Sequence, residues 1–151
     1  MKLRRVAAWV CLGAVLFLGA GNGYGFDQGQ LKQLLTSNEC PGCDLSGASL
    51  SGANLSRSNL AGANLSGAYL SDANLAGANC SKANLSGAYL NSAYLANADL
   101  TDANLADAKM FLVILVGAKL SGAVITDARL SAALYIDGQR CAEGSVGECT
   151  R

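Results

Sequence analysis

The sequence predicts an all-β fold in which the chain winds into a coil with four short sides, and three observations support this prediction. Leucine occupies 15 of the 19 positions that follow one another at intervals of five from Leu45 to Tyr135. Alanine occupies 16 of the 19 positions that lie two residues before these. The six residues Leu65 to Leu70 recur letter for letter at Leu85 to Leu90, twenty residues further along the chain.

A period of five residues fits neither regular secondary structure. On an α-helix five residues turn through about 500°, which spreads successive leucines around every face. On a flat strand an odd period sends every second leucine to the opposite face. The conflict disappears if the chain turns a corner after each unit. Alanine and leucine then both point inward, the residue between them points outward, and the glycine, serine, asparagine and aspartate that follow make the turn.

The twenty-residue recurrence indicates four units per coil. Stacking at this interval aligns like residues and opposite charges: Tyr69 with Tyr89, Asn64 with Asn84 and Asn104, Lys82 with Asp102, and Asp99 with Lys119. It also aligns two pairs of like charge, Lys109 with Arg129 and Asp107 with Asp127. The charges therefore give mixed support, and four sides remain the better prediction.

The unit Ala63-Asn64-Leu65-Ser66-Gly67 resembles the pentapeptide-repeat family, whose pattern is Ala-(Asp/Asn)-Leu-x-x. The resemblance covers residues 43–135 without an insertion or deletion. It implies a right-handed quadrilateral β-helix, and stacked repeats over this length make about 4.5 coils. The handedness comes from the resemblance alone. Some members of the family are similar to duplex DNA in shape and charge, and protect DNA gyrase from quinolones.

The first 25 residues have the three parts of a secretory signal peptide. A positive head, Met1 to Arg5, precedes an apolar run, Val6 to Ala20, and a small and polar stretch, Gly21 to Gly25. A helix of fifteen residues spans about 22 Å, less than the ~30 Å of a bilayer core. We therefore predict cleavage and export to the bacterial periplasm, with the medium or an organelle lumen as alternative destinations.

Both ends of a stack of repeats need caps, because a repeat buries its core only against its neighbours. The predicted division is a signal peptide at 1–25, a capping helix and turn at 26–42, the repeat at 43–136 and a tail at 137–151. In the capping helix, Leu31, Leu34 and Leu35 are expected on one face, with Asn38 as its end. The turn signal Asp137-Gly138 opens the polar tail.

The composition excludes several classes of function. The chain has no histidine, which removes imidazole acid–base catalysis and imidazole metal ligands. Its 11 basic and 11 acidic side chains leave no broad basic surface for nucleic acid. An unbroken repeat filled by leucine has no loop that walls a cleft. We predict no enzyme activity, no cofactor and no metal, and interpret Asp99, Asp102, Asp107 and Asp127 as solvated turn residues.

Five cysteines follow the predicted signal peptide, and in an oxidising compartment disulfides are their first interpretation. Cys40 and Cys43 have the spacing of a redox dithiol or half a zinc site, but Cys141 and Cys149 lie at the far end of the stack. We predict two local disulfides, Cys40–Cys43 and Cys141–Cys149, with catalytic or reduced thiols as the alternatives. Cys80 replaces a leucine and is expected in the core.

An apolar run, Met110 to Val116, interrupts the polar surface of the repeat. By phase, Met110, Val113 and Leu115 point inward and the other four residues outward, and stacking adds three more apolar side chains to the same wall. We call these seven outward residues the outer apolar patch: Tyr94, Phe111, Leu112, Ile114, Val116, Leu134 and Ile136. A contiguous exposed patch usually marks a contact. The C-terminal tail, a second copy and another protein are the three candidate occupants.

These features predict a non-catalytic exported scaffold that contacts a partner protein or a second copy through the outer apolar patch. We expect it to bind no nucleic acid and, after signal cleavage, no membrane. One alternative is a DNA-mimicking gyrase protector, although the repeat carries six acidic against five basic groups. The other is a thiol redox protein using Cys40 and Cys43, which lacks a βαβ context.

Overall fold

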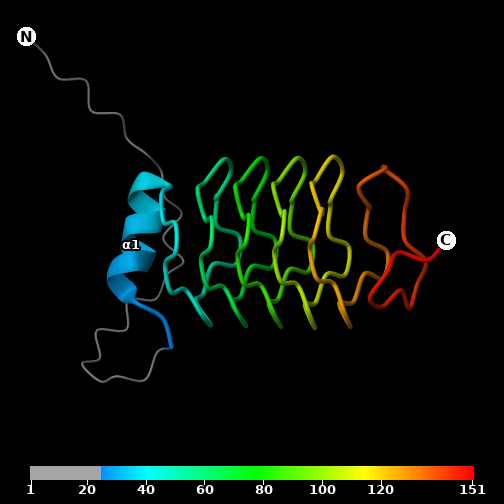
Figure 1. Ribbon diagram of the computed structural model, residues 1–151, viewed down its shortest axis with the longest axis horizontal. Helices are drawn as coiled ribbons and strands as arrows, with labels where there is room; N and C mark the ends of the chain where they lie inside the picture. The colour runs from blue at the N-terminus through cyan, green and yellow to red at the C-terminus, as the bar shows by residue number, and fades with distance from the viewer. Residues whose placement is uncertain (1–24) are drawn as a thin grey trace, which may run out of the picture.

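The computed structural model describes residues 25–151 and shows a regular coil with a helix at one end (Figure 1). The predicted signal peptide lies outside the described residues, apart from Gly25. The helix, α1 (Gln28–Ser37), lies at the N-terminal end, and the last residues of the chain lie at the other end. No helix in the described part of the chain has the length and hydropathy needed to span a membrane.

The coil repeats every twenty residues, as the sequence predicted. Parallel β-bridges join residues twenty positions apart, from Glu39 with Asn59 to Ile114 with Leu134, at every fifth residue. The ladder thus begins slightly before the predicted start of the repeat at Cys43. Each bridge involves a single residue on each side, so the described residues contain no longer strand. The reason is that the chain turns a corner after every five residues.

The corners are β-turns held by two kinds of hydrogen bond. At a representative corner, the Ala68 N–H donates to the Leu65 carbonyl at 3.0 Å, and Gly67 has φ of 62°, as in a type II turn. Asn64 Oδ1 accepts from the Ser66 N–H at 3.2 Å. An asparagine at the outward position therefore supports the turn that follows it. The five-residue pattern alone does not predict this role.

The interior is a column of leucine side chains with alanine beside them. Leu65, Leu85 and Leu105 are at most 1% exposed, and the alanines that precede them by two residues, such as Ala83, are fully buried. Cys80 continues the column at 1% exposure. In the apolar run, Met110, Val113 and Leu115 point inward as predicted and are 0–1% exposed.

Asp27 caps the N-terminus of helix α1, and its carboxylate accepts hydrogen bonds from the N–H groups of Gly29 and Gln30. It ends at Asn38, which has φ of 61° and donates its N–H to the Leu34 carbonyl. Leu34 is fully buried and Leu31 partly buried. The expectation that Leu35 shares this face is wrong, because Leu35 is 56% exposed. It lies about 100° around the helix from Leu34, beyond the narrow line of contact with the coil.

The C-terminal tail runs back, antiparallel, across the end of the last coil. Leu134 pairs with Arg140 and Arg129 with Val146. The Tyr135 N–H donates to the Gln139 carbonyl at 2.8 Å. A disulfide between Cys141 and Cys149 closes the tail. The tail therefore adds one further rung on the two sides of the coil that carry Arg129 and Leu134.

One of the two opposite-charge pairs expected from stacking forms. Lys119 Nζ lies 3.4 Å from Asp99 Oδ2. Lys82 and Asp102 make no ion pair within residues 25–151. Both occupy exposed corner positions with positive φ, where an ion pair gains little over solvation.

Ser58 generates a prediction about stability. It occupies an alanine position, is 1% exposed, and its Oγ has no hydrogen-bond partner within the described residues. Because an unpaired buried hydroxyl costs about 1–3 kcal/mol, we expect Ser58→Ala to raise the free energy of unfolding by about 1 kcal/mol. Urea titration measures this change. Ala83→Ser is the matched control and should lower the same quantity, whereas a lower value for Ser58→Ala would contradict the assignment.

Candidate functional site

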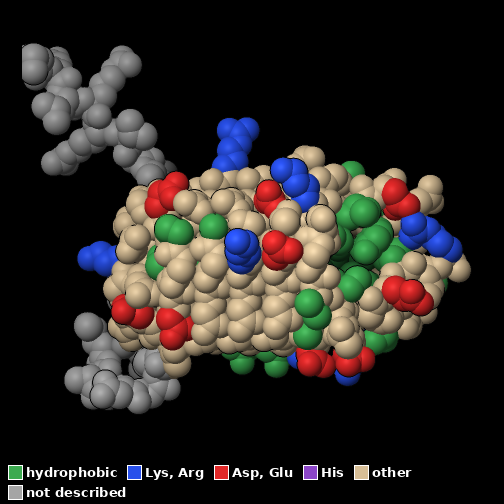
Figure 2. Space-filling model, in the orientation of Figure 1, with side chains coloured by type: hydrophobic (Ala, Val, Ile, Leu, Met, Phe, Trp, Pro, Cys, Tyr) green, Lys and Arg blue, Asp and Glu red, His purple; other side chains and the backbone are tan. Residues whose placement is uncertain are grey.

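The outer apolar patch lies on one wall and two corners near the C-terminal end of the coil. Tyr94, Ile114 and Leu134 occupy successive rungs of one ladder. Five of the seven side chains are substantially exposed: Tyr94 by 44%, Phe111 by 48%, Leu112 by 40%, Val116 by 36% and Ile136 by 40%. Ile114 and Leu134 are partly buried. Figure 2 shows hydrophobic side chains gathered in this part of the molecule.

The C-terminal tail does not cover the patch. The tail instead lies on the end of the coil, where the Leu130 N–H donates to the Ser145 carbonyl at 2.8 Å and the Cys141 N–H to the Ala133 carbonyl at 2.8 Å. Buried backbone groups require partners, and the end of the coil offers unpaired ones. Of the three candidate occupants, the tail is therefore the wrong one.

Leu112 is the most unusual residue of the patch. It has φ of 56°, the left-handed conformation that occurs at the second turn residue of every corner. The other corners place glycine, alanine or a polar or charged residue there. A left-handed conformation costs a non-glycine residue roughly 1–2 kcal/mol, and Leu112 is also 40% exposed. Neither packing nor turn chemistry explains a leucine at this corner.

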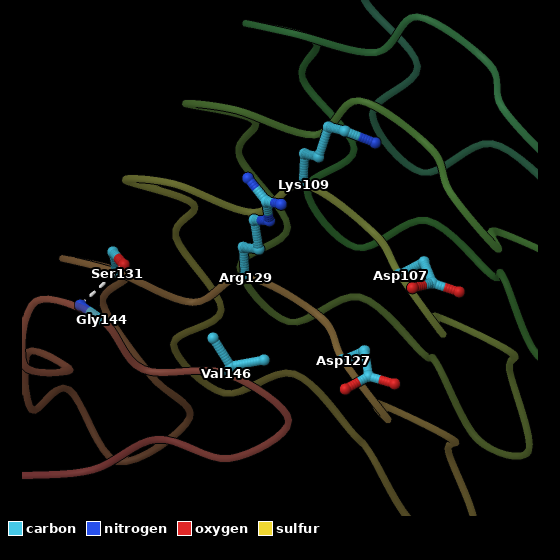
Figure 3. A pocket seen from close by; sticks show the side chains of 7 residues that line it. All are labelled: Asp107, Lys109, Asp127, Arg129, Ser131, Gly144 and Val146. Carbon is cyan, nitrogen blue, oxygen red and sulfur yellow. Dashed lines mark hydrogen bonds between the residues drawn. The ribbon is translucent and has the colours of Figure 1, made fainter.

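A shallow groove of about 530 Å³ lies beside the patch, between the coil and the tail (Figure 3). Its lining residues carry two cations and two carboxylates: Asp107, Lys109, Asp127, Arg129, Ser131, Gly144 and Val146. Lys109 and Arg129 stack one rung apart, as the sequence predicted. Lys109 Nζ lies 4.5 Å from the centre of the Tyr89 ring, which partly compensates the repulsion.

The charged side chains that line the groove do not converge on one point. Asp107 and Asp127 are exposed corner residues, and Figure 3 shows them apart from the two cations. Within residues 25–151 no three potential ligands among His, Cys, Asp and Glu come together as a metal-binding group. The rings of Tyr69 and Tyr89 stack with their centroids 4.9 Å apart. They act as a structural ladder on the wall that also carries Lys109 and Arg129.

The cysteines that the sequence singled out lie in the interior or in the tail. Cys40 is linked to Cys43, with Cα atoms 5.4 Å apart, and Cys141 to Cys149, with Cα atoms 5.0 Å apart. Cys40 is fully buried and Cys43 is 5% exposed, so their disulfide sits in the core at the first corner. Burial raises the pKa of the Cys80 thiol to about 12, and the nearby charge of Asp99 adds to this effect.

Asp99 has the opposite environment. Hydrogen bonds from the side chain and backbone of Thr101 lower the pKa of its carboxyl group, and Lys119 contributes further. Asp44 behaves alike, because hydrogen bonds from Ser46 lower the pKa of its carboxyl group. Each of these carboxylates supports the turn that follows it. The interpretation of Asp99 as a solvated turn residue is wrong, because Asp99 stands before the turn, pairs with Lys119 in a ladder and is partly buried.

The comparison with known families agrees with this geometry. The family "Pentapeptide repeats" matches residues 40–77, 68–107 and 78–115, with eight copies of the repeat. The chain belongs to the pentapeptide-repeat family. Its members fold as right-handed β-helices and are generally non-catalytic scaffolds. Among curated proteins no relative matches.

Several solved structures are similar to this pentapeptide-repeat chain. HetL, from the cyanobacterium Nostoc sp. strain PCC 7120 and involved in heterocyst differentiation regulation, is 29% identical with a TM-score of 0.40, over 68% of this chain and 63% of HetL. A second pentapeptide repeat protein from Nostoc is 33% identical with a TM-score of 0.47, over 67% and 77%. One from the thylakoid lumen of Arabidopsis thaliana is 29% identical with a TM-score of 0.38, over 87% and 93%. The chain thus spans less than two thirds of the length of HetL.

Substitution of two neighbouring residues, Ile114 and Leu115, tests which side chains point outward and which point inward. Ile114→Asp places a carboxylate on the outer wall, and we expect the thermal unfolding curve to stay close to that of the parent chain. Leu115→Asp buries a carboxylate in a fully buried position, which costs several kcal/mol, and should abolish cooperative unfolding. Leu115→Met is the conservative control. Equal loss of structure in both aspartate variants, measured by circular dichroism, would contradict the assigned directions.

Thiol labelling tests the state of the cysteines. In the chain without residues 1–25, we expect iodoacetamide to modify no cysteine of the folded protein when no reductant is present. After unfolding in guanidinium, only Cys80 should react, because the other four cysteines are paired. Peptide mass spectrometry identifies the labelled sites. Labelling of Cys40 or Cys43 in the folded protein would overturn their buried disulfide.

Proposed function

We propose that the chain is a non-catalytic scaffold that acts outside the cytosol and binds a partner protein through the outer apolar patch. The observation that carries this proposal is the exposed apolar cluster around Leu112, in a coil whose other corners have glycine, alanine or a polar or charged residue at the second turn position. Leu112 lowers both the stability and the solubility of the free chain. Its presence is explained if burying its side chain in a complex stabilises that complex. A second copy of the chain is the other candidate occupant.

The composition of the patch suits a protein interface. Phe111 and Tyr94 supply aromatic side chains of the kind that anchor interfaces, and Leu112 and Val116 surround them with aliphatic surface. The patch carries no charged side chain. The coil beneath is a rigid stack of hydrogen-bonded rungs, so the patch loses little conformational entropy on binding.

Export is supported by the cysteines and by the leader. Two disulfides persist only where the compartment is oxidising, and the first 25 residues have the layout of a cleaved signal peptide. One similar structure comes from a thylakoid lumen, which is also outside the cytosol. The proposed destination is the bacterial periplasm or an equivalent compartment outside the cytosol.

The two alternative functions lack support in the described residues. A redox exchange at Cys40 and Cys43 requires access for an attacking thiolate, and both sulfur-bearing side chains are 5% exposed or less. DNA mimicry requires a strongly acidic surface, and the repeat carries six acidic and five basic groups. Neither alternative uses the outer apolar patch.

In-cell photocrosslinking tests the proposal. A photoreactive residue at position 114 should capture a defined exported protein, identified by mass spectrometry. The same residue at position 54 is the matched control, because Asn54 is exposed and stands at the outward position of the same wall, outside the patch. Capture at 114 should fall when Phe111→Ser is added.

Two results of this experiment would contradict the proposal that the patch binds another protein. Capture of a second copy at position 114 would make the patch a homodimer interface in place of a site for another protein. Absence of any capture from a folded, exported chain would refute a role for the patch in binding.

A further inference from the structure

One wall of the coil carries two cations on adjacent rungs that have no carboxylate partner. The ladder on this wall passes from Tyr89 through Lys109 to Arg129. In the described part of the chain, neither Lys109 nor Arg129 makes an ion pair, and the Arg129 side chain donates no hydrogen bond. The opposite wall differs, because Lys119 pairs there with Asp99 one rung earlier. We call Lys109 and Arg129 the cation pair, and its guanidinium donors are available to a ligand.

The cation pair has an electrostatic reason to bind an anion. Lys109 and Arg129 form a parallel β-bridge, so two like charges stand side by side, which lowers stability. Lys109 Nζ lies 4.5 Å from the centre of the Tyr89 ring. Figure 3 shows the side chains of the pair directed away from the tail. A carboxylate bound to the Arg129 guanidinium group would reduce the repulsion within the pair and form charge-assisted hydrogen bonds.

Two shallow grooves share the cation pair, and one of them connects it to the outer apolar patch. The larger groove, of about 530 Å³, lies between the coil and the tail and is lined on the tail side by Gly144 and Val146. The smaller groove, of about 300 Å³, is lined by Asn91, Phe111 and Ser131 together with the pair. Phe111 belongs to the outer apolar patch and is 48% exposed. A partner that covers the patch therefore also reaches the cation pair.

The order of residues across this wall selects the kind of ligand. Along one rung, the chain passes from Asp107 at an exposed corner to Lys109 on the wall and Phe111 at the next corner. The next rung repeats the acidic and cationic positions with Asp127 and Arg129. A nucleic acid or an anionic membrane presents a row of negative charges, which the two corner carboxylates would repel. A protein segment can instead place a single carboxylate at the cation pair and an apolar side chain on Phe111.

From these observations we propose that the partner of the outer apolar patch binds through a segment in which an acidic side chain stands next to an apolar one. The apolar side chain packs on Phe111, the carboxylate accepts hydrogen bonds from the Arg129 guanidinium group, and Lys109 adds to the attraction. The inference rests on the proposed function, since it concerns the same partner, and it adds the charge that this partner carries. The cation pair also gives specificity, because a partner without the carboxylate would bury the pair uncompensated.

Charge reversal in the in-cell crosslinking experiment tests this inference. With the photoreactive residue at position 114, Arg129→Glu should lower the yield of the captured partner by about tenfold or more, because attraction is replaced by repulsion. Lys82→Glu is the matched control, since it makes the same change of charge at an exposed corner outside the patch and should leave the yield unchanged. Both substituted side chains are exposed, so both variants should fold, which circular dichroism checks.

The outcomes separate this inference from the proposed function. If Arg129→Glu captures the partner as well as the parent chain does, the partner binds the patch without an acidic segment, and the inference is wrong while the proposed function stands. If the parent chain captures no partner, the proposed function is refuted and the inference falls with it. An equal loss of capture in Lys82→Glu would show a general effect of charge and would also overturn a role for the cation pair.

A second photoreactive position locates the acidic segment. Ser131 lines both grooves beside the cation pair, so a photoreactive residue at position 131 should capture the same partner. Mass spectrometry of the crosslinked peptide should find an aspartate or glutamate near the crosslinked position. Replacing that acidic residue by lysine should weaken binding to the parent chain and restore binding to Arg129→Glu. Failure to capture the partner at position 131, or a crosslinked segment without an acidic residue, would contradict the inference.

Discussion

Every rung of this molecule depends on the rung twenty residues away. Each side of the coil is too short to form a strand with internal regularity, so its N–H and carbonyl groups find partners only on the coils above and below. The same stacking buries the leucines, because an isolated coil would expose its interior at both ends. Hydrogen bonding and core burial thus impose one requirement on the sequence, a strict period of five residues with no insertion.

This dependence makes the two ends the structurally demanding parts of the chain. At the N-terminal end, α1 places Leu34 over the first coil, and the disulfide of Cys40 with Cys43 replaces core side chains at the first corner. At the C-terminal end, the tail extends only two sides of the coil. The difference follows from the caps themselves. A helix covers the end with side chains, whereas an extended tail of this length covers only the sides with which it pairs.

The corners tolerate many residue types because they face solvent. Binding residues can therefore stand at the corners without destabilising the fold. Most corners use glycine, asparagine or aspartate, which accept a positive φ at little cost. Leu112 departs from this rule on the surface of a coil whose five-residue period has no insertion or deletion. In a repeat protein, such a departure on the outside is more informative about binding than any residue of the core.

The period, the inward direction of leucine and alanine, the outward direction of Phe111 and Leu112, and the local pairing of the cysteines were all predictable from the sequence. These features depend on spacing along the chain, which a repeat displays many times over. The exposure of Leu35, the turn-supporting role of Asn64, and the course of the tail, which extends only two sides of the coil, were decided only by the tertiary structure. They arise from contacts between segments that lack a shared period, such as Arg129 with Val146, and the choice of which sides the tail pairs with leaves no trace in local sequence. Contacts between repeats can be predicted from the sequence, whereas contacts between the repeat and the segments that cap it cannot.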